Sequence, residues 1–150
     1  MGSIFSSFNI NSSGLTAQRY RMDIISQNIA NANTTRTADG TPYRRKVVTF
    51  AEKNTHTPFS RVLNTARDRY SGDGVKVDRV YEDEETDMTM VYDPSHPDAD
   101  ENGYVTYPNV NIITEMTNMI DASRAYEANS TAFNASKAIA MKGLEIGQSQ

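Results

Sequence analysis

The sequence predicts a mainly α protein in which long N- and C-terminal helices pair as an antiparallel coiled coil, with a small β-containing insert between them. Three observations support this fold class. Apolar residues recur at steps of three, four and seven near both ends of the chain. Neither Gly nor Pro occurs in residues 15–39 or 109–142, and all five prolines lie between residues 42 and 108. Because proline costs about 3 kcal/mol inside a helix, the middle of the chain is where helices are not expected.

The first helix is expected to begin at residues 11–13, where Asn and Ser are good N-cap residues. It is expected to end near Asn31–Asn33, because Asn tolerates the left-handed conformation that closes a helix. Its apolar stripe has one member in every seventh position plus one intermediate residue: Phe8, Leu15, Met22, Ile29 and Ile25.

The second helix is expected to follow Pro108, with Asn109 or Asn111 as its cap and Glu115 in an early turn. It is expected to run to Lys142, where Gly143 is a stop or a weak point. Its stripe comprises Ile112, Met116, Met119, Tyr126, Phe133, Ala140 and Leu144. We expect a set of four residues of the first helix to face a set of four of the second: Leu15, Met22, Ile25 and Ile29 against Met116, Met119, Tyr126 and Phe133.

The insert carries strand signals at residues 46–50, 74–81, 88–92 and 104–107. Asp39-Gly40 and Asp73-Gly74 are typical of turns. The acidic run 82–85 is expected at a solvated loop tip, and the basic run 44–46 at a solvated or partner-facing edge. The predicted domains are therefore a discontinuous helical core, residues 1–33 and 108–150, and an insert, residues 34–107.

Composition restricts the function classes. The chain has 150 residues, 37% of them hydrophobic, which is low for a compact globule, and a net charge of -4. An acidic chain argues against nucleic acid as the main partner. The absence of Cys excludes disulfides, thiolate zinc sites and cysteine nucleophiles. No apolar run is long enough for a membrane span, and no basic segment typical of a cleaved signal peptide opens the chain. These features fit either a cytoplasmic protein or an export route without cleavage.

The strongest candidate site is Asp98-Ala99-Asp100-Glu101-Asn102-Gly103, which matches the opening of an EF-hand calcium loop. The match fails at its twelfth position, where Asn109 replaces a bidentate Glu. The alternative is a tight turn ordered by Asp side chains. Asp93, His96 and Asp98 could form a weak metal or acid–base cluster, although a His between two prolines is more often a loop residue that hydrogen-bonds its neighbours. No nucleophile elbow, phosphate loop or dinucleotide fingerprint is present, so an enzyme is not expected.

The stripes themselves allow two interpretations. The helices could form an ordinary intramolecular hairpin, or they could pack against other molecules. Ser123, Ser130 and Lys137 occupy seam positions of the second helix, which is poor for a two-helix core that stands alone. The neighbouring faces carry small residues and Asn that suit close helix contacts on several sides: Asn118, Ala122, Ala125, Asn129, Asn134 and Ala138. The pattern therefore favours packing between molecules.

Two segments resemble a known family. Ser13-Gly14-Leu15-Thr16-Ala17-Gln18-Arg19, followed by residues 25–34 with Asn28-Ile29-Ala30-Asn31, resembles the N-terminal signature of bacterial flagellar rod and hook proteins. Residues 118–129 are similar to the C-terminal helix of the same family. Residues 91–105 and 107–110 are similar to its proximal-rod members, and the resemblance covers essentially the whole chain. The usual Gly-Tyr after the Asn-x-x-Thr motif is replaced by residues 35–38, which leaves that loop open.

The resemblance implies a structural subunit that polymerises through its terminal helices into a hollow axial shaft, with no cofactor and no small-molecule substrate. It implies as partners copies of the chain, other rod subunits, the inner-membrane ring with its adaptor protein, and the type III export apparatus. It places the chain in the rod that crosses the periplasm. Another rod or hook subunit and a calcium-dependent binding module remain the alternatives. We expect the assembly interface to contain Leu15, Met22, Ile25, Ile29, Asn31, Asn33, Met116, Met119, Tyr126, Phe133 and Leu144.

Overall fold

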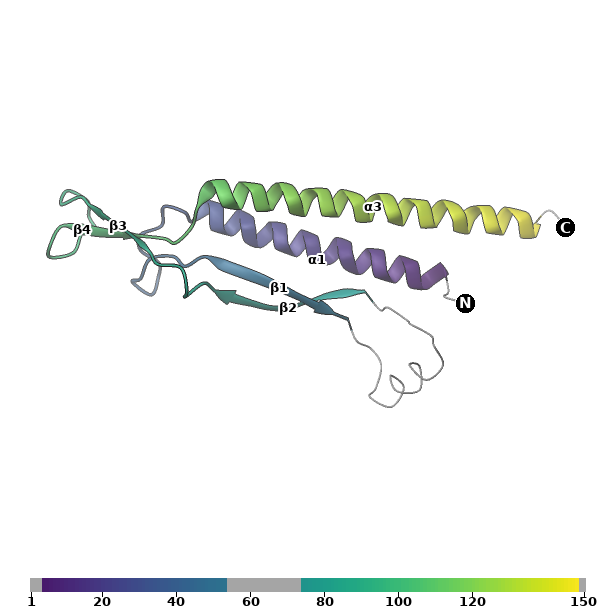
Figure 1. Ribbon diagram of the computed structural model, residues 1–150, viewed down its shortest axis with the longest axis horizontal. Coiled ribbons are helices and arrows are strands. Elements are labelled where there is room, and N and C mark those ends of the chain that lie inside the picture. Colours follow the sequence, from purple (N-terminus) through teal and green to yellow (C-terminus); the bar gives the residue numbers. More distant parts are fainter. Residues whose placement is uncertain (1–3, 54–73, 149–150) are drawn as a thin grey trace, which may run out of the picture. The chain divides into compact units, whose positions relative to one another are not determined.

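The computed structural model describes residues 4–53 and 74–148 (Figure 1). Along the chain, one long helix precedes four strands and a second long helix follows them, which confirms a mainly α protein with a small β insert. Among the described residues, no helix combines the length and the apolar character needed to span a membrane. The elements are α1 (Ile4–Ala30), β1 (Lys46–Glu52), β2 (Val75–Glu82), β3 (Thr89–Tyr92), β4 (Tyr104–Tyr107) and α3 (Ile112–Gln148).

Helix α1 begins at Ile4, earlier than the start expected at residues 11–13. The residues expected as caps lie inside the helix, and one of them, Ser13, bonds back to the preceding turn. The Ser13 Oγ donates to the Ile10 carbonyl at 2.7 Å, which is the way Ser is accommodated in a helix interior. The helix ends at Ala30, directly before the Asn-rich stretch expected to close it.

Helix α3 uses Asn111 as its cap, one of the two expected candidates. The Asn111 Oδ1 accepts hydrogen bonds from the Ile113 and Thr114 N–H groups at 3.0 and 3.2 Å. The helix then continues through Gly143, which was expected to be a stop or a weak point. A single Gly costs only about 1 kcal/mol in a helix, so it weakens this segment without ending it.

Contacts divide the chain into two compact units. Unit 1 contains Met1–Arg19, Phe50–Asp78 and Ser123–Gln150, and unit 2 contains Tyr20–Thr49 and Arg79–Ala122. Both helices and both strands β1 and β2 contribute residues to each unit. This division follows contacts rather than sequence composition, so the domains expected at 1–33 with 108–150 and at 34–107 stay a prediction.

The strands form two small sheets, β1 with β2 and β3 with β4. All four lie within two residues of the segments expected from the sequence. In the antiparallel β3–β4 pair, Val91 lies opposite Val105 and Tyr92 opposite Tyr104. Val105 is completely buried, whereas Met90 and Tyr92 on β3 are 60% and 64% exposed. The β3–β4 sheet therefore packs through one face and leaves apolar groups on the other.

Two turns depend on glycine. Gly40 and Gly103 have φ angles of 78° and 80°, a region that L side chains rarely adopt. The Gly40 N–H donates to the Thr37 carbonyl at 3.0 Å, which confirms the turn expected at Asp39-Gly40. For the other expected turn, Gly74 has φ 94°, and Asp73 lies outside the described residues.

The two glycines provide a matched pair for measurement. A Cβ at Gly103 would lie 3.0 Å from the Tyr92 Cε2 and 3.1 Å from the Pro94 Cγ, whereas a Cβ at Gly40 would meet nothing within 4 Å. We expect Gly40→Ala to lower the free energy of unfolding by about 1–2 kcal/mol through backbone strain alone. Gly103→Ala should cost more because a steric clash is added. Urea unfolding measures the free energy of unfolding of both variants. Equal losses would show that the Tyr92 and Pro94 side chains move away from the new Cβ at no cost.

Candidate assembly site

The side chain of Asn28 lies at the centre of unit 2 and is completely buried. Its Nδ2 donates to the Lys46 carbonyl and to the Glu115 Oε2, each at 2.9 Å. Its Oδ1 accepts from the Tyr43 hydroxyl at 2.8 Å and from the Lys46 N–H at 2.9 Å. A carboxamide offers two donors and two acceptor sites, so every one is used. One side chain thus joins the end of α1, the start of β1 and the start of α3.

Arg45 pairs with two carboxylates. Its Nε lies 2.9 Å from the Glu115 Oε1, and its Nη1 lies 3.3 Å from the Asp83 Oδ2. The Glu115 side chain is only 1% exposed, so its charge is compensated inside the protein rather than by water. Burial by itself lowers the pKa of Arg45, but the hydrogen bonds and charges of Glu115 and Asp83 together outweigh it and raise the pKa, which keeps the guanidinium charged.

Asp83 and Asn109 extend this arrangement. The Asp83 carboxylate accepts hydrogen bonds from the N–H of Glu85 and from the N–H and hydroxyl of Thr86, at 2.9–3.2 Å. The bonds from Thr86 contribute most to lowering the pKa of Asp83, and Arg45 adds to the effect. The Asn109 Nδ2 donates to the Asp83 and Thr86 carbonyls, and its Oδ1 accepts from the Arg45 N–H. Asn109 therefore fixes the backbone on both sides of the ion pair.

The connected side chains form one network, which we call the polar node: Asn28, Tyr43, Arg45, Asp83, Asn109 and Glu115. Burial raises the pKa of Tyr43, and the charges of Glu82 and Glu115 raise it further, so its hydroxyl stays protonated and can donate to Asn28. All six residues belong to unit 2.

The polar node corrects two expectations. The acidic run 82–85 was expected to be solvated, but Asp83 is only 9% exposed. The basic run 44–46 was expected at a solvated or partner-facing edge, but Arg45 is turned toward Glu115 and Asp83. The remaining acids of the run, Glu82, Glu84 and Glu85, are exposed as expected. Composition identified both runs as polar but gave no indication of which member each run turns inward.

Segments of the two helices contact each other within unit 1. The rings of Phe8 and Phe133, one from each expected stripe, pack edge to face with centroids 5.1 Å apart. A Cβ on Gly14 would lie 2.6 Å from the Asn129 Oδ1, so the missing side chain permits this close approach. Both contacts involve residues that the sequence assigned to helix packing.

The residues of the expected assembly interface differ widely in burial. Ile25 is buried, whereas Met116 and Leu144 are 55% and 68% exposed. Met116 was expected to face the first helix, but Glu115 is the buried residue of that turn. Asn33 is exposed, and the following residues are partly buried: Leu15, Met22, Ile29, Asn31, Met119, Tyr126 and Phe133. Their role between subunits stays a prediction.

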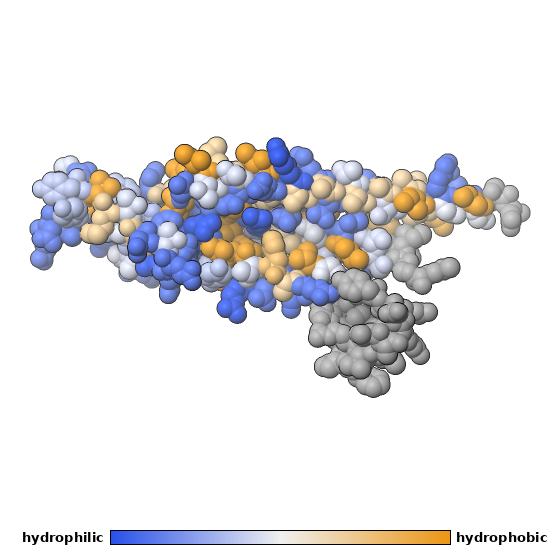
Figure 2. Space-filling model, viewed as in Figure 1, coloured by the Kyte–Doolittle hydropathy of each residue, from blue (hydrophilic) through white to orange (hydrophobic). Residues whose placement is uncertain are grey.

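Helix α3 exposes many large apolar side chains (Figure 2). In unit 2, Ile113, Met116 and Ile120 are 78%, 55% and 53% exposed and follow helical spacing. In unit 1, Ile139, Met141, Leu144 and Ile146 are 54–72% exposed. Apolar residues grouped in this way are typical of surfaces that bind other proteins.

The loop that resembles a calcium site uses its carboxylates internally. The Asp100 Oδ1 accepts from the Asn102 and Tyr104 N–H groups at 2.9 and 2.8 Å. The Asp98 carboxylate binds the Thr35 hydroxyl at 2.8 Å and lies 3.6 Å from Arg36. These contacts confirm the alternative of a turn ordered by Asp side chains.

His96 is a loop residue that hydrogen-bonds a neighbour, which was the predicted alternative to a metal or acid–base role. Its Nδ1 accepts a hydrogen bond from the Asp98 N–H at 3.1 Å. Asp93 instead binds Ser95 at 2.6 Å. Within residues 4–53 and 74–148, no group of three or more His, Cys, Asp or Glu side chains could hold a metal ion. The Asp93, His96 and Asp98 cluster is therefore a set of local hydrogen bonds.

The importance of the Asn28 side chain can be measured directly. Asn28→Ala leaves a buried Glu115 oxygen, a Tyr43 hydroxyl and the Lys46 backbone groups without a partner. We expect the free energy of unfolding to fall by at least about 2 kcal/mol, because each unsatisfied buried group costs about 1–3 kcal/mol. Asn33→Ala is the matched control at an exposed position and should change it by less than about 0.5 kcal/mol. If Asn28→Ala and Asn33→Ala lower the free energy of unfolding equally, the hydrogen bonds of Asn28 are not important for stability.

The lowered pKa of Asp83 predicts a specific acid response. The folded state binds the Asp83 proton less tightly than the unfolded state, so this group stabilises the fold fully above its unfolded pKa of about 3.9. That contribution is lost as the pH falls through the lower folded pKa. Urea unfolding between about pH 7 and pH 3 should therefore show a steeper loss for the wild type than for Asp83→Asn. Parallel curves for the two proteins would contradict the assignment.

Comparison with known proteins identifies the family. Residues 8–36 match the family model of the flagella basal body rod protein, and residues 101–146 match that of the C-terminal region of the flagellar basal body rod FlgEFG protein. The chain is 46% identical to the flagellar basal-body rod protein FlgC of Bacillus subtilis (strain 168), over 96% of this chain and 98% of that protein.

Two further relatives agree. The FlgC of Borreliella burgdorferi is 47% identical over 97% of this chain and 98% of its own length. The FlgC of Escherichia coli O157:H7 is 40% identical over 94% of this chain and 96% of its own length. The two family models cover most of α1 and α3, and the relatives also cover the insert that holds the polar node. The chain therefore belongs to the FlgC family of flagellar basal-body rod proteins, as a structural protein and not an enzyme.

Proposed function

We propose that this chain is a structural subunit of the proximal rod, which polymerises through its terminal helices into a hollow axial shaft that passes torque outward. The observation that carries the proposal is the likeness to FlgC proteins along nearly the whole chain, 46% with the Bacillus subtilis protein. The matches at residues 8–36 and 101–146 support a role for the terminal segments in particular.

The helices of the subunit pair as an antiparallel coiled coil in this proposal. The contacts of unit 1 support it, because the partner on α3 moves from Phe133 to Asn129 as the position on α1 advances from Phe8 to Gly14. The seven-residue spacing of Phe8, Leu15 and Met22 supports knobs-into-holes packing along the same seam.

The exposed apolar residues of α3 support polymerisation. A subunit that keeps Ile113, Ile139 and Ile146 67–78% exposed in isolation gains stability when neighbours cover these side chains. The assembly interface expected from the sequence, from Leu15 through Leu144, is part of this proposal. The discontinuous helical core, residues 1–33 and 108–150, would supply that interface.

The proposed partners are copies of this chain, other rod subunits, the inner-membrane ring with its adaptor protein, and the type III export apparatus. The proposed location is the part of the rod that crosses the periplasm, reached without a cleaved signal peptide. A tagged copy in a strain that lacks the chromosomal gene tests the location. Immunogold labelling of isolated basal bodies should mark the inner-membrane end of the rod. Label confined to the hook, or absent from basal bodies, would overturn the proposal.

The helix seam can be tested in cells. Met22→Glu and Tyr126→Glu each place a charge on a partly buried seam position, which is costly when the seam closes. We expect either variant to stop rod growth and swimming while a tagged copy is still exported into the culture supernatant. Ala38→Glu, in an exposed loop, is the matched control and should swim normally. Normal swimming of the two seam variants would show that the seam is wrongly assigned.

A further inference from the structure

Unit 1 contains a groove of about 440 Å³ between α1, the start of β2 and Lys53, which directly follows β1. This volume falls within the range of about 300–1,000 Å³ that is usual for binding pockets. The wall on the α1 side is tied to the sheet by the Val75 N–H, which donates to the Ser13 Oγ at 3.0 Å. The groove, which we call the lysine groove, is lined by Asn9, Ser12, Ser13, Thr16, Ala17, Lys53, Val75, Lys76 and Val77.

Two lysines contribute positive charge to the lysine groove. Lys53 and Lys76 both line it, and no carboxylate does. In the described part of the chain, no ion pair involves either lysine. Glu52 directly precedes Lys53, and Asp78 follows Lys76 by two positions, but neither carboxylate lines the groove. Hydroxyl groups and short apolar side chains complete the surface, so the groove suits a short, acidic protein segment.

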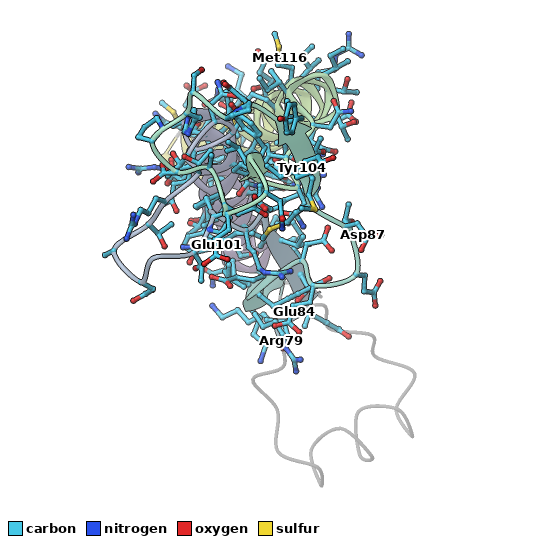
Figure 3. All side chains as sticks on the ribbon, turned by 90° about the vertical axis from the view of Figure 1, so that its left-hand side faces the viewer. Arg79, Glu84, Asp87, Glu101, Tyr104 and Met116 are labelled. Atoms are coloured by element: carbon cyan, nitrogen blue, oxygen red, sulfur yellow. The ribbon has the colours of Figure 1, made fainter. Side chains whose placement is uncertain are left out.

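The chain itself carries a segment of that chemistry. Residues 82–101 contain no Lys or Arg and hold nine of the 19 Asp and Glu residues of the chain. Within them, Glu84–Asp87, which we call the acidic loop, consists entirely of exposed residues between β2 and β3. The side chains of Glu84 and Asp87 project outward from unit 2 (Figure 3).

The acidic loop is ordered before it binds anything. The buried Asp83 carboxylate accepts hydrogen bonds from the Glu85 N–H and from the N–H and hydroxyl of Thr86. Arg45 holds the same carboxylate from the other side. Because the loop is fixed by its base, it loses little conformational freedom on binding, and most of the interaction with a partner remains available for affinity.

We propose that the lysine groove of one copy of this chain receives the acidic loop of a second copy. The contact joins different surfaces of the two copies, so each copy keeps one groove or one loop free for a further neighbour. Such heterologous contacts build rings or open helical arrays rather than closed dimers. The inference deepens the proposed function, on which it rests, by naming one contact between copies within the shaft. Exposed Lys–carboxylate pairs are individually weak, so the contact depends on salt.

Sedimentation of the purified full chain tests the contact, at about 50 mM and about 500 mM NaCl, where charge screening differs strongly. The wild type should self-associate at low salt and dissociate at high salt. Lys53→Glu/Lys76→Glu and Glu84→Lys/Asp87→Lys should each weaken self-association at least about tenfold, because both pairs are lost. Arg36→Glu reverses an exposed loop charge outside the groove and outside both helices, and should leave self-association unchanged.

A mixture of the two charge-reversed variants gives the decisive result. Each variant keeps the surface that complements the other, so an equimolar mixture should regain wild-type association although neither variant associates alone. A monomeric mixture, a monomeric wild type at low salt, or an equal effect of the Arg36→Glu control would overturn the inference. If circular dichroism shows that the groove variant is unfolded, Lys53→Gln/Lys76→Gln replaces it. Wild-type chain missing from basal bodies contradicts the proposed function instead, whichever result the mixture gives.

Discussion

The four hydrogen bonds of the Asn28 side chain are the interaction on which unit 2 depends. They link the buried Asn28 side chain of α1 to the Lys46 backbone, to Tyr43 and to Glu115. Only a carboxamide supplies two donors and two acceptors in this geometry. An Asp would add a second negative charge beside Glu115, and an apolar residue would leave each partner unsatisfied. The Arg45 ion pairs then compensate the charge that Asn28 helps to bury.

Local signals account for what the sequence predicted. The strands were evident from β-branched and aromatic runs, and the helices from the positions of Gly and Pro. The stripe spacing identified Phe8 and Phe133, which do pack together. The polar node was missed because it depends on contacts between distant residues. Arg45 lies between Arg44 and Lys46, and only the fold determines which of the three side chains turns toward the interior. A signal did exist at Glu115, which shares helical spacing with Met119 and with the fully buried Ala122.

Polar contacts take the place of a large hydrophobic core in the described part of the chain. Among the described residues, the buried hydrophobic side chains are mostly small or medium, such as Ala17, Ile24, Ile25 and Val105, while many large apolar residues are exposed. Little hydrophobic area is therefore buried inside one molecule. The hydrogen bonds and ion pairs of the polar node specify the arrangement of α1, β1 and α3 in unit 2 instead. A chain built this way has a fixed local geometry at one site and surfaces that become stable when other subunits cover them. Both properties suit a member of a polymer.

The separation of the polar-node residues along the chain also constrains when unit 2 can fold. Asn28 and Glu115 are 87 positions apart, and Arg45 and Glu115 are 70 apart. Closing such loops costs entropy before any contact compensates it, so the node is a late event in folding. At a synthesis rate of about 5–20 residues per second, the 87 residues take roughly 4–17 s to follow Asn28 out of the ribosome. During that interval Asn28 on α1 cannot form its hydrogen bond to Glu115 on α3. The nascent chain can then be bound by any factor that recognises unfolded polypeptide.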